Sequence, residues 1–120
     1  NGWVVWAKDA NAGLLSASAG YTIATNPGVN STLSAGTTGY NTGVTTTAPT
    51  LGPTPTIAAP FIGGGTTGGG LDATLRIIAS SSAPNDTAIL TLKNNVAIST
   101  VVPAAADYTD TISVIGAGLF

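Results

Sequence analysis

Apolar residues in this chain recur at every second position over short runs, and nowhere with the spacing of an amphipathic helix. In residues 2–8, for example, Trp3 and Val5 fall on one face of an extended strand, whereas Val4 and Trp6 fall on the other. Gly, Pro or clusters of Thr and Ser interrupt every stretch that is long enough to form a helix. The sequence therefore predicts short β-strands separated by turns.

Runs of this kind are spread over the 120 residues, a length that suits one domain. Because turn residues separate neighbouring runs, the sequence predicts an all-β fold, an antiparallel sandwich of about seven or eight short strands (Ig-like or jelly-roll-like), over residues 1–120. The expected core is thin and built from Ala, Val, Ile and Leu. The runs are residues 2–8, 21–25, 40–47, 55–62, 71–79, 87–93, 96–102 and 108–115.

Three local patterns give more specific expectations. Asn94-Asn95 favours a tight hairpin turn, because Asn tolerates a positive φ angle. The glycine-rich residues 63–70 predict a mobile surface loop rather than a phosphate-binding loop, since neither a lysine nor a helix follows them. In residues 71–79, the alternation predicts that the odd-numbered side chains point inward and that those at 72, 74 and 76 point outward.

Charged side chains make up only 7 % of the chain, against about 25 % in a typical soluble domain. The absence of His and Cys removes most nucleophilic catalysis, the usual zinc, haem and iron–sulfur ligands, and disulfides. We therefore expect no enzyme, no catalytic residue and no cofactor. With a net charge of −2 and no basic cluster, nucleic acid is not an expected partner. The longest stretch without a polar side chain, residues 57–65, is too short for membrane insertion.

Four residues are candidate calcium ligands through their side-chain oxygens: Asp9, Asn11, Asp107 and Asp110. They form two closely spaced pairs, and hard cations take oxygen ligands of this kind. The chain contains only five acidic residues and no EF-hand pattern. Turn capping is therefore the alternative role for these residues, and a metal is not part of the main expectation.

Two segments match the acceptor pattern for N-linked glycans, Asn30-Ser31-Thr32 and Asn85-Asp86-Thr87. Both lie at expected loop positions, where a glycan could hydrate a surface that carries few charges. Asn30 and Asn85 are therefore possible glycosylation sites. In a chain so rich in Asn and Thr, chance matches are the alternative.

Both ends of the chain carry apolar residues. The first strand is apolar on both faces, which suits insertion into another subunit, where both rows of side chains become buried. Residues 1–8 are therefore a possible donated strand, and the C-terminal end is the alternative donor. The residues expected in contacts between identical subunits are Trp3, Val4, Val5, Trp6, Val114, Ile115, Leu119 and Phe120.

The segment 103–114 (PAAADYTDTISV) resembles the closing strand of spore coat protein U-like pilins of the archaic chaperone–usher type. Residues 2–18 are also similar to exported bacterial surface proteins with Thr-rich sandwiches. The resemblance implies a fibre subunit that polymerises by donor-strand exchange and carries neither a cofactor nor catalytic residues.

We therefore expect a structural subunit of an extracellular, pilus-like filament at the cell surface. Identical copies would self-assemble by donating a β-strand to one another. Two alternatives use the same features of the sequence. A carbohydrate-binding or adhesin module would use exposed Trp, Tyr and Thr side chains, and a virion coat or fibre domain would be another self-assembling sandwich.

Overall fold

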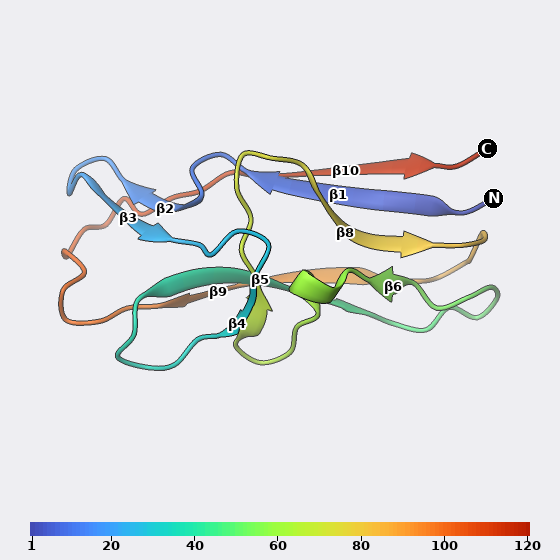
Figure 1. The fold of residues 1–120 in the computed structure, drawn as a ribbon, viewed down its shortest axis with the longest axis horizontal. Helices are drawn as coiled ribbons and strands as arrows, with labels where there is room; N and C mark the ends of the chain where they lie inside the picture. The colour runs from blue at the N-terminus through green and yellow to red at the C-terminus, as the bar shows by residue number, and fades with distance from the viewer.

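The computed structural model describes all 120 residues, and they form ten β-strands and one 3₁₀ helix, with no α-helix (Figure 1). The single helical element has three residues, so no helix of this chain has the length and apolar character of a membrane span. The elements are β1 (Trp3–Asp9), β2 (Gly13–Ser16), β3 (Tyr21–Ala24), β4 (Asn30–Thr32), β5 (Gly39–Thr46), β6 (Thr56–Ile57), η1 (Ala59–Phe61), β7 (Thr67–Gly69), β8 (Arg76–Ser81), β9 (Leu90–Ala97) and β10 (Ile112–Gly118).

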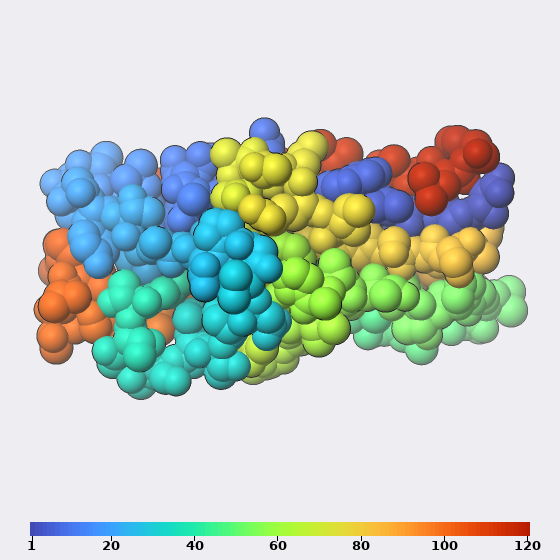
Figure 2. All heavy atoms as spheres, in the orientation of Figure 1, coloured from blue at the N-terminus to red at the C-terminus, as the bar shows by residue number.

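The strands form two four-stranded antiparallel sheets, with the orders β10-β1-β8-β6 and β4-β7-β5-β9. The two sheets form two layers, and β2 and β3 make a separate hairpin at one end (Figure 1). The molecule measures 48 × 24 × 21 Å, and its two chain ends lie side by side at one end of the long axis (Figure 2). The all-β antiparallel sandwich predicted from the sequence is therefore confirmed.

β1 is an internal strand of the first sheet. It pairs with β10 on one edge, from Trp3 opposite Gly118 to Asp9 opposite Ile112, and with β8 on the other. Ala7 and Asp9 are fully buried, so the odd-numbered side chains face the second sheet and the even-numbered ones face outward. The alternation predicted for this strand is confirmed.

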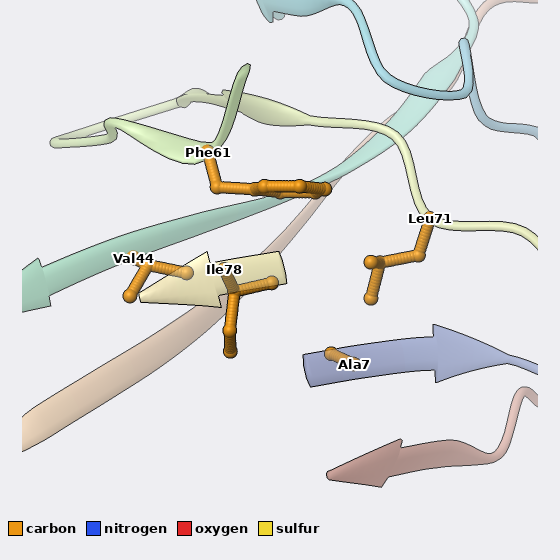
Figure 3. Close-up of a cluster of buried hydrophobic side chains, with 5 residues drawn as sticks. All are labelled: Ala7, Val44, Phe61, Leu71 and Ile78. Atoms are coloured by element: carbon orange, nitrogen blue, oxygen red, sulfur yellow. The ribbon is translucent and has the colours of Figure 1, made fainter. Parts of the chain in front are cut away.

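The hydrophobic core is small, and its main cluster contains five buried residues (Figure 3). Phe61 on η1 and Leu71 after β7 belong to segments that cross between the two sheets, and both are only 1 % exposed. These crossings seal the side of the sandwich where β6 and β4 are the sheet edges, which we call the closed side. The cluster consists of Ala7, Val44, Phe61, Leu71 and Ile78.

The inward and outward assignment predicted for residues 71–79 is wrong in part. Leu71 and Ala79 are buried as expected, but Leu75 and Ile77 are exposed and Ile78 is buried. The pairing of β1 with β8 shifts register between Val5 and Trp6, which inserts one extra residue into β8. This bulge reverses the face of every β8 side chain on one side of it.

The hairpin turn predicted at Asn94-Asn95 is also wrong, because β9 runs straight through both residues. The Thr42 Oγ1 donates a hydrogen bond to the Asn94 Oδ1 at 2.8 Å, and the Asn95 Nδ2 donates one to the Asn41 Oδ1 at 2.9 Å. Both Asn side chains therefore hold β9 to β5 rather than forming a turn.

Only part of the predicted glycine loop, residues 63–70, is a loop. Its second half forms β7, which lies between β4 and β5 in the second sheet. A Cβ atom on Gly68 would lie 2.5 Å from the backbone N of Gly43. The glycines are therefore required because two backbones pass close to each other.

Candidate functional site

The side of the sandwich where β9 and β10 are the sheet edges is not sealed, and we call it the open side. Each of these strands pairs with one neighbour only, β9 with β5 and β10 with β1. Two hollows lie along this side, of about 410 Å³ and 470 Å³. Leu90 and Gly116 line the first hollow, and Val96 and Ile112 line the second, so both strands contribute to each hollow.

Apolar side chains that point into the sandwich are exposed on the open side. Val114 lies opposite Ala7, so it faces the interior, yet it is 51 % exposed, whereas Ala7 is 0 % exposed. Val96 lies opposite the buried Tyr40 and is 53 % exposed. A Cβ atom on Gly116 would meet only Val5, at 3.8 Å. The interior next to β10 therefore has room for further side chains.

The free edge of β10 carries unpaired backbone groups. The Leu119 N–H donates to the Gly2 carbonyl at 2.8 Å. Because the register between β1 and β10 has no irregularity, this bond determines which of the opposed residues are hydrogen-bonded pairs. In an antiparallel pair, every second residue exchanges hydrogen bonds with its partner. Ile115 therefore bonds to Trp6, whereas the backbone N–H of Val114 points away from β1. An added strand would find free donors and acceptors there.

The outer face of the first sheet carries an apolar row across three strands. Trp6 is the central residue, and its neighbours in the sheet are Ile115 on β10 and Ile77 on β8. Both isoleucines are almost half exposed. Packing of this row against another apolar surface would remove it from water.

The residues expected at subunit interfaces fall into two groups. Trp3, Val4, Val5 and Trp6 lie in β1, which pairs on both edges within its own chain. Val114, Ile115, Leu119 and Phe120 lie in β10 or just after it, and all four are exposed. The structure thus leaves the C-terminal group accessible and makes β1 a central strand of its own sheet.

The amide groups of both predicted glycosylation sites make hydrogen bonds within the fold. The Asn85 Nδ2 donates to the Pro53 carbonyl at 3.0 Å, and the Asn85 Oδ1 accepts from the Trp3 indole at 3.2 Å. Asn30 begins strand β4, and its Nδ2 donates to the carbonyls of Pro60 and Ile62. A glycan on either nitrogen would replace one of its two N–H groups and so compete with the bonds that the nitrogen donates.

The four candidate calcium ligands are divided by the structure. Asp107 accepts hydrogen bonds from the Ser16 hydroxyl and from the Ser18 hydroxyl at 2.7 Å, and these bonds lower the pKa of Asp107. Asn11 is exposed. Asp9 and Asp110, in contrast, come together where β1 ends and the chain approaches β10.

Asp9 is 1 % exposed, and its Oδ1 accepts a hydrogen bond from the Ala12 N–H at 2.7 Å. Burial is the main cause that raises the pKa of Asp9, and the negative charge of Asp110 raises it further. The same two carboxylates and, above all, burial raise the pKa of Tyr40 to about 12. The three groups therefore share one poorly solvated acidic region.

No positive side chain balances this region. The single salt bridge of the chain joins Arg76 to Asp72 at 2.6 Å, and it lowers the pKa of Asp72. The aspartates nowhere form a metal-binding group of three or more. A cation at this place would have Asp9 and Asp110 as its carboxylate ligands.

Comparisons with protein families, with curated protein sequences and with solved structures find no match to this chain. Sequence reasoning missed the contribution of β9 to the open side, because it placed a turn in the middle of that strand.

Proposed function

We propose that this protein is a structural subunit of an extracellular filament, in which identical copies assemble by donating a β-strand to one another. The observation that carries the proposal is the state of β10. It is an edge strand in which five of seven residues are exposed and none is buried. It is therefore attached mainly by backbone hydrogen bonds.

A strand attached in this way can be exchanged between copies at low cost. When β10 leaves its own β1, it loses a ladder that it regains with the β1 of a neighbouring copy in the same register. Residues 98–111, which contain no strand of the two sheets, connect β10 to the rest of the chain, and they would provide the reach once Thr109 releases its two backbone hydrogen bonds to Leu15. Of the two ends considered as donors, the C-terminal one therefore needs the smaller rearrangement, because β1 would have to leave two partners.

Two further surfaces support assembly. Val114 and Val96 face into the open side without being covered, and the row around Trp6 is apolar on the outer face. Only 7 % of the residues are charged, so few charges keep such surfaces apart. Contacts between copies would cover what the single chain leaves exposed.

The carbohydrate-binding and virion-coat functions remain alternatives without a specific observation in their favour. A sugar platform needs aromatic rings on one face, whereas Trp3 and Trp6 point to opposite faces of β1.

Cysteine cross-linking distinguishes an exchanged β10 from one that stays on its own chain. Lys8 and Ser113 are opposite each other in the register and form a hydrogen-bonded pair. The Cα atoms of such a pair are about 5.5 Å apart, within the range of a disulfide. The chain has no native cysteine. Mixing Lys8→Cys chains with Ser113→Cys chains and oxidising them should give a covalent heterodimer if β10 is exchanged.

The matched control mixes Ser113→Cys with Thr37→Cys, an exposed residue in the loop between β4 and β5, and should give no more than background cross-linking. A chain with both Lys8→Cys and Ser113→Cys should form ladders of dimers and larger species at high concentration. If that double variant gave only monomers with an internal disulfide, and the wild type stayed monomeric, the proposal would be wrong.

A further inference from the structure

Two carboxylate oxygens at the end of β1 are buried and have no hydrogen-bond partner. They are the Oδ2 atoms of Asp9 and Asp110, and they are the two such atoms of the chain. Buried polar atoms in native proteins nearly always have a partner, so an unpaired one indicates a water, an ion or a proton. Here two unpaired oxygens belong to neighbouring acidic groups.

The other oxygen of each carboxylate is already fixed by the backbone. The Asp9 Oδ1 accepts from Ala12, and the Asp110 Oδ1 accepts from Thr111 at 2.7 Å and from Ala10 at 3.4 Å. These bonds hold both carboxylates in place, although their like charges repel each other. No lysine or arginine forms an ion pair with either of them. The fold thus maintains a negatively charged pair that its own residues do not neutralise.

We propose that Asp9 and Asp110 hold a divalent cation, Ca²⁺, which their two unpaired oxygens ligate. Ca²⁺ accepts carboxylate, carbonyl and water oxygens in variable number, so a pair of carboxylates completed by waters is a suitable, weak site. A hollow of about 470 Å³ is lined by Asp110, although not by Asp9, so the ion and its waters would approach the pair from the Asp110 side. This proposal goes beyond the structural function proposed above and does not depend on it.

The position of the site gives the cation a mechanical role. Asp9 is the last residue of β1, and Asp110 lies two residues before β10 begins. A cation between them joins the end of β1 to the start of β10 on the same chain. We expect Ca²⁺ to stabilise the folded chain because the ion binds the native arrangement only.

The first experiment measures the melting temperature of the full chain in EDTA and in rising Ca²⁺. The wild type should melt several degrees higher with Ca²⁺, with a rise that begins at about 0.1–1 mM, the affinity of extracellular calcium modules, and then grows with the logarithm of the Ca²⁺ concentration. Asp110→Asn should lose this shift. Asp107→Asn is the matched control and should keep the Ca²⁺-dependent shift, because the Asp107 carboxylate already accepts hydrogen bonds from Ser16 and Ser18.

Asp9→Asn gives a second, independent readout. In EDTA this variant should be at least as stable as the wild type, because it removes one of two buried like charges, yet it should not respond to Ca²⁺. A large loss of stability in EDTA would mean that the fold itself needs the Asp9 carboxylate, and would count against the cation.

Terbium luminescence tests the site in the unmodified protein. Tb³⁺ binds calcium sites, and Tyr40 lies close enough to Asp110 and Asp9 for their charges to shift its pKa, so it can sensitise the emission. We expect a saturable signal that Ca²⁺ displaces and that Asp110→Asn removes. A wild type that shows neither the signal nor the Ca²⁺ shift, and that is stabilised by acid instead, would overturn the proposal in favour of a shared proton.

Discussion

The closed side and the open side of this sandwich differ in what fills the space between the sheets. On the closed side, Phe61 and Leu71 sit on segments that cross from one sheet to the other, and both are buried. On the open side, Val114 and Val96 face the interior but stay half exposed, although residues 98–111 connect β9 to β10 there. The closed side thus holds the single chain together, whereas the open side leaves apolar surface uncovered.

The largest expected effect contrasts two residues that lie directly opposite each other, Ala7 and Val114. Ala7→Asp would place an unpaired charge in the core and should cost about 3–5 kcal/mol, enough to unfold most of the protein. Val114→Asp should cost less than about 1 kcal/mol, because the side chain can reach water. Urea unfolding measures both, and equal losses would contradict the division into two sides.

Replacing a glycine by alanine should destabilise the fold on the closed side and stabilise it on the open side. A Cβ atom on Gly68 would lie 2.5 Å from backbone atoms of β5, so Gly68→Ala should cost about 1–3 kcal/mol. A Cβ atom on Gly116 would be in ordinary contact with Val5 at 3.8 Å, so Gly116→Ala should stabilise by about 0.5 kcal/mol. Thermal unfolding compares the pair, and a destabilised Gly116→Ala chain would show that the open side has no spare room.

Proline substitutions in β10 test which of its backbone N–H groups are bonded to β1. Ile115→Pro removes a donor that bonds to Trp6 and should destabilise the chain by about 1–2 kcal/mol. Val114→Pro is the neighbouring control and should cost less, because its N–H points away from β1. Guanidinium unfolding followed by tryptophan fluorescence measures the stability of both variants. A larger loss in Val114→Pro than in Ile115→Pro would contradict this assignment of the free N–H groups.

The smallest expected effect concerns the segment that leads to β10. Hydrogen bonds from Ser16 and Ser18 lower the pKa of Asp107 below its ordinary value of 3.8. The ionised carboxylate therefore stabilises the fold above pH 3.8, and this contribution is lost as the pH falls toward the lowered pKa.

The wild type should thus exceed Asp107→Asn in stability at neutral pH by a small amount that shrinks in acid. Unfolding curves of both chains between neutral pH and pH 3 give the difference. Because Asp107 is exposed, the effect is small. A stability difference that grew as the pH fell would contradict the predicted pH dependence.

The sequence predicted the fold class and the faces of β1, because alternation in an extended strand depends only on local geometry. It failed at β8, where one bulge reversed the faces of Ile77 and Ile78. It also failed at Asn94-Asn95, since a residue that suits a turn can equally extend a strand when a partner such as Asn41 receives its side chain. Both errors come from tertiary contacts that a local pattern does not contain.

The candidate sites were predictable only in part. The apolar character of both chain ends is visible in the sequence, but which strand becomes an edge depends on the order of strands in the sheet. Asp9 and Asp110 were each candidates, yet they lie near opposite ends of the chain and meet only because β1 pairs with β10. Nothing in the sequence indicated that Val96 faces the interior and is nevertheless exposed.

The antiparallel pairing of the two chain ends determines how the molecule responds to force. When Gly2 and Leu119 are pulled apart at the same end, the ladder opens like a zipper, one residue pair after another toward Ile112. If the same strand instead lies on a neighbouring copy, tension along the row of subunits acts parallel to the strands and loads every pair at once. We therefore expect identical hydrogen bonds to yield easily in a lone chain and to resist strongly in a linked one.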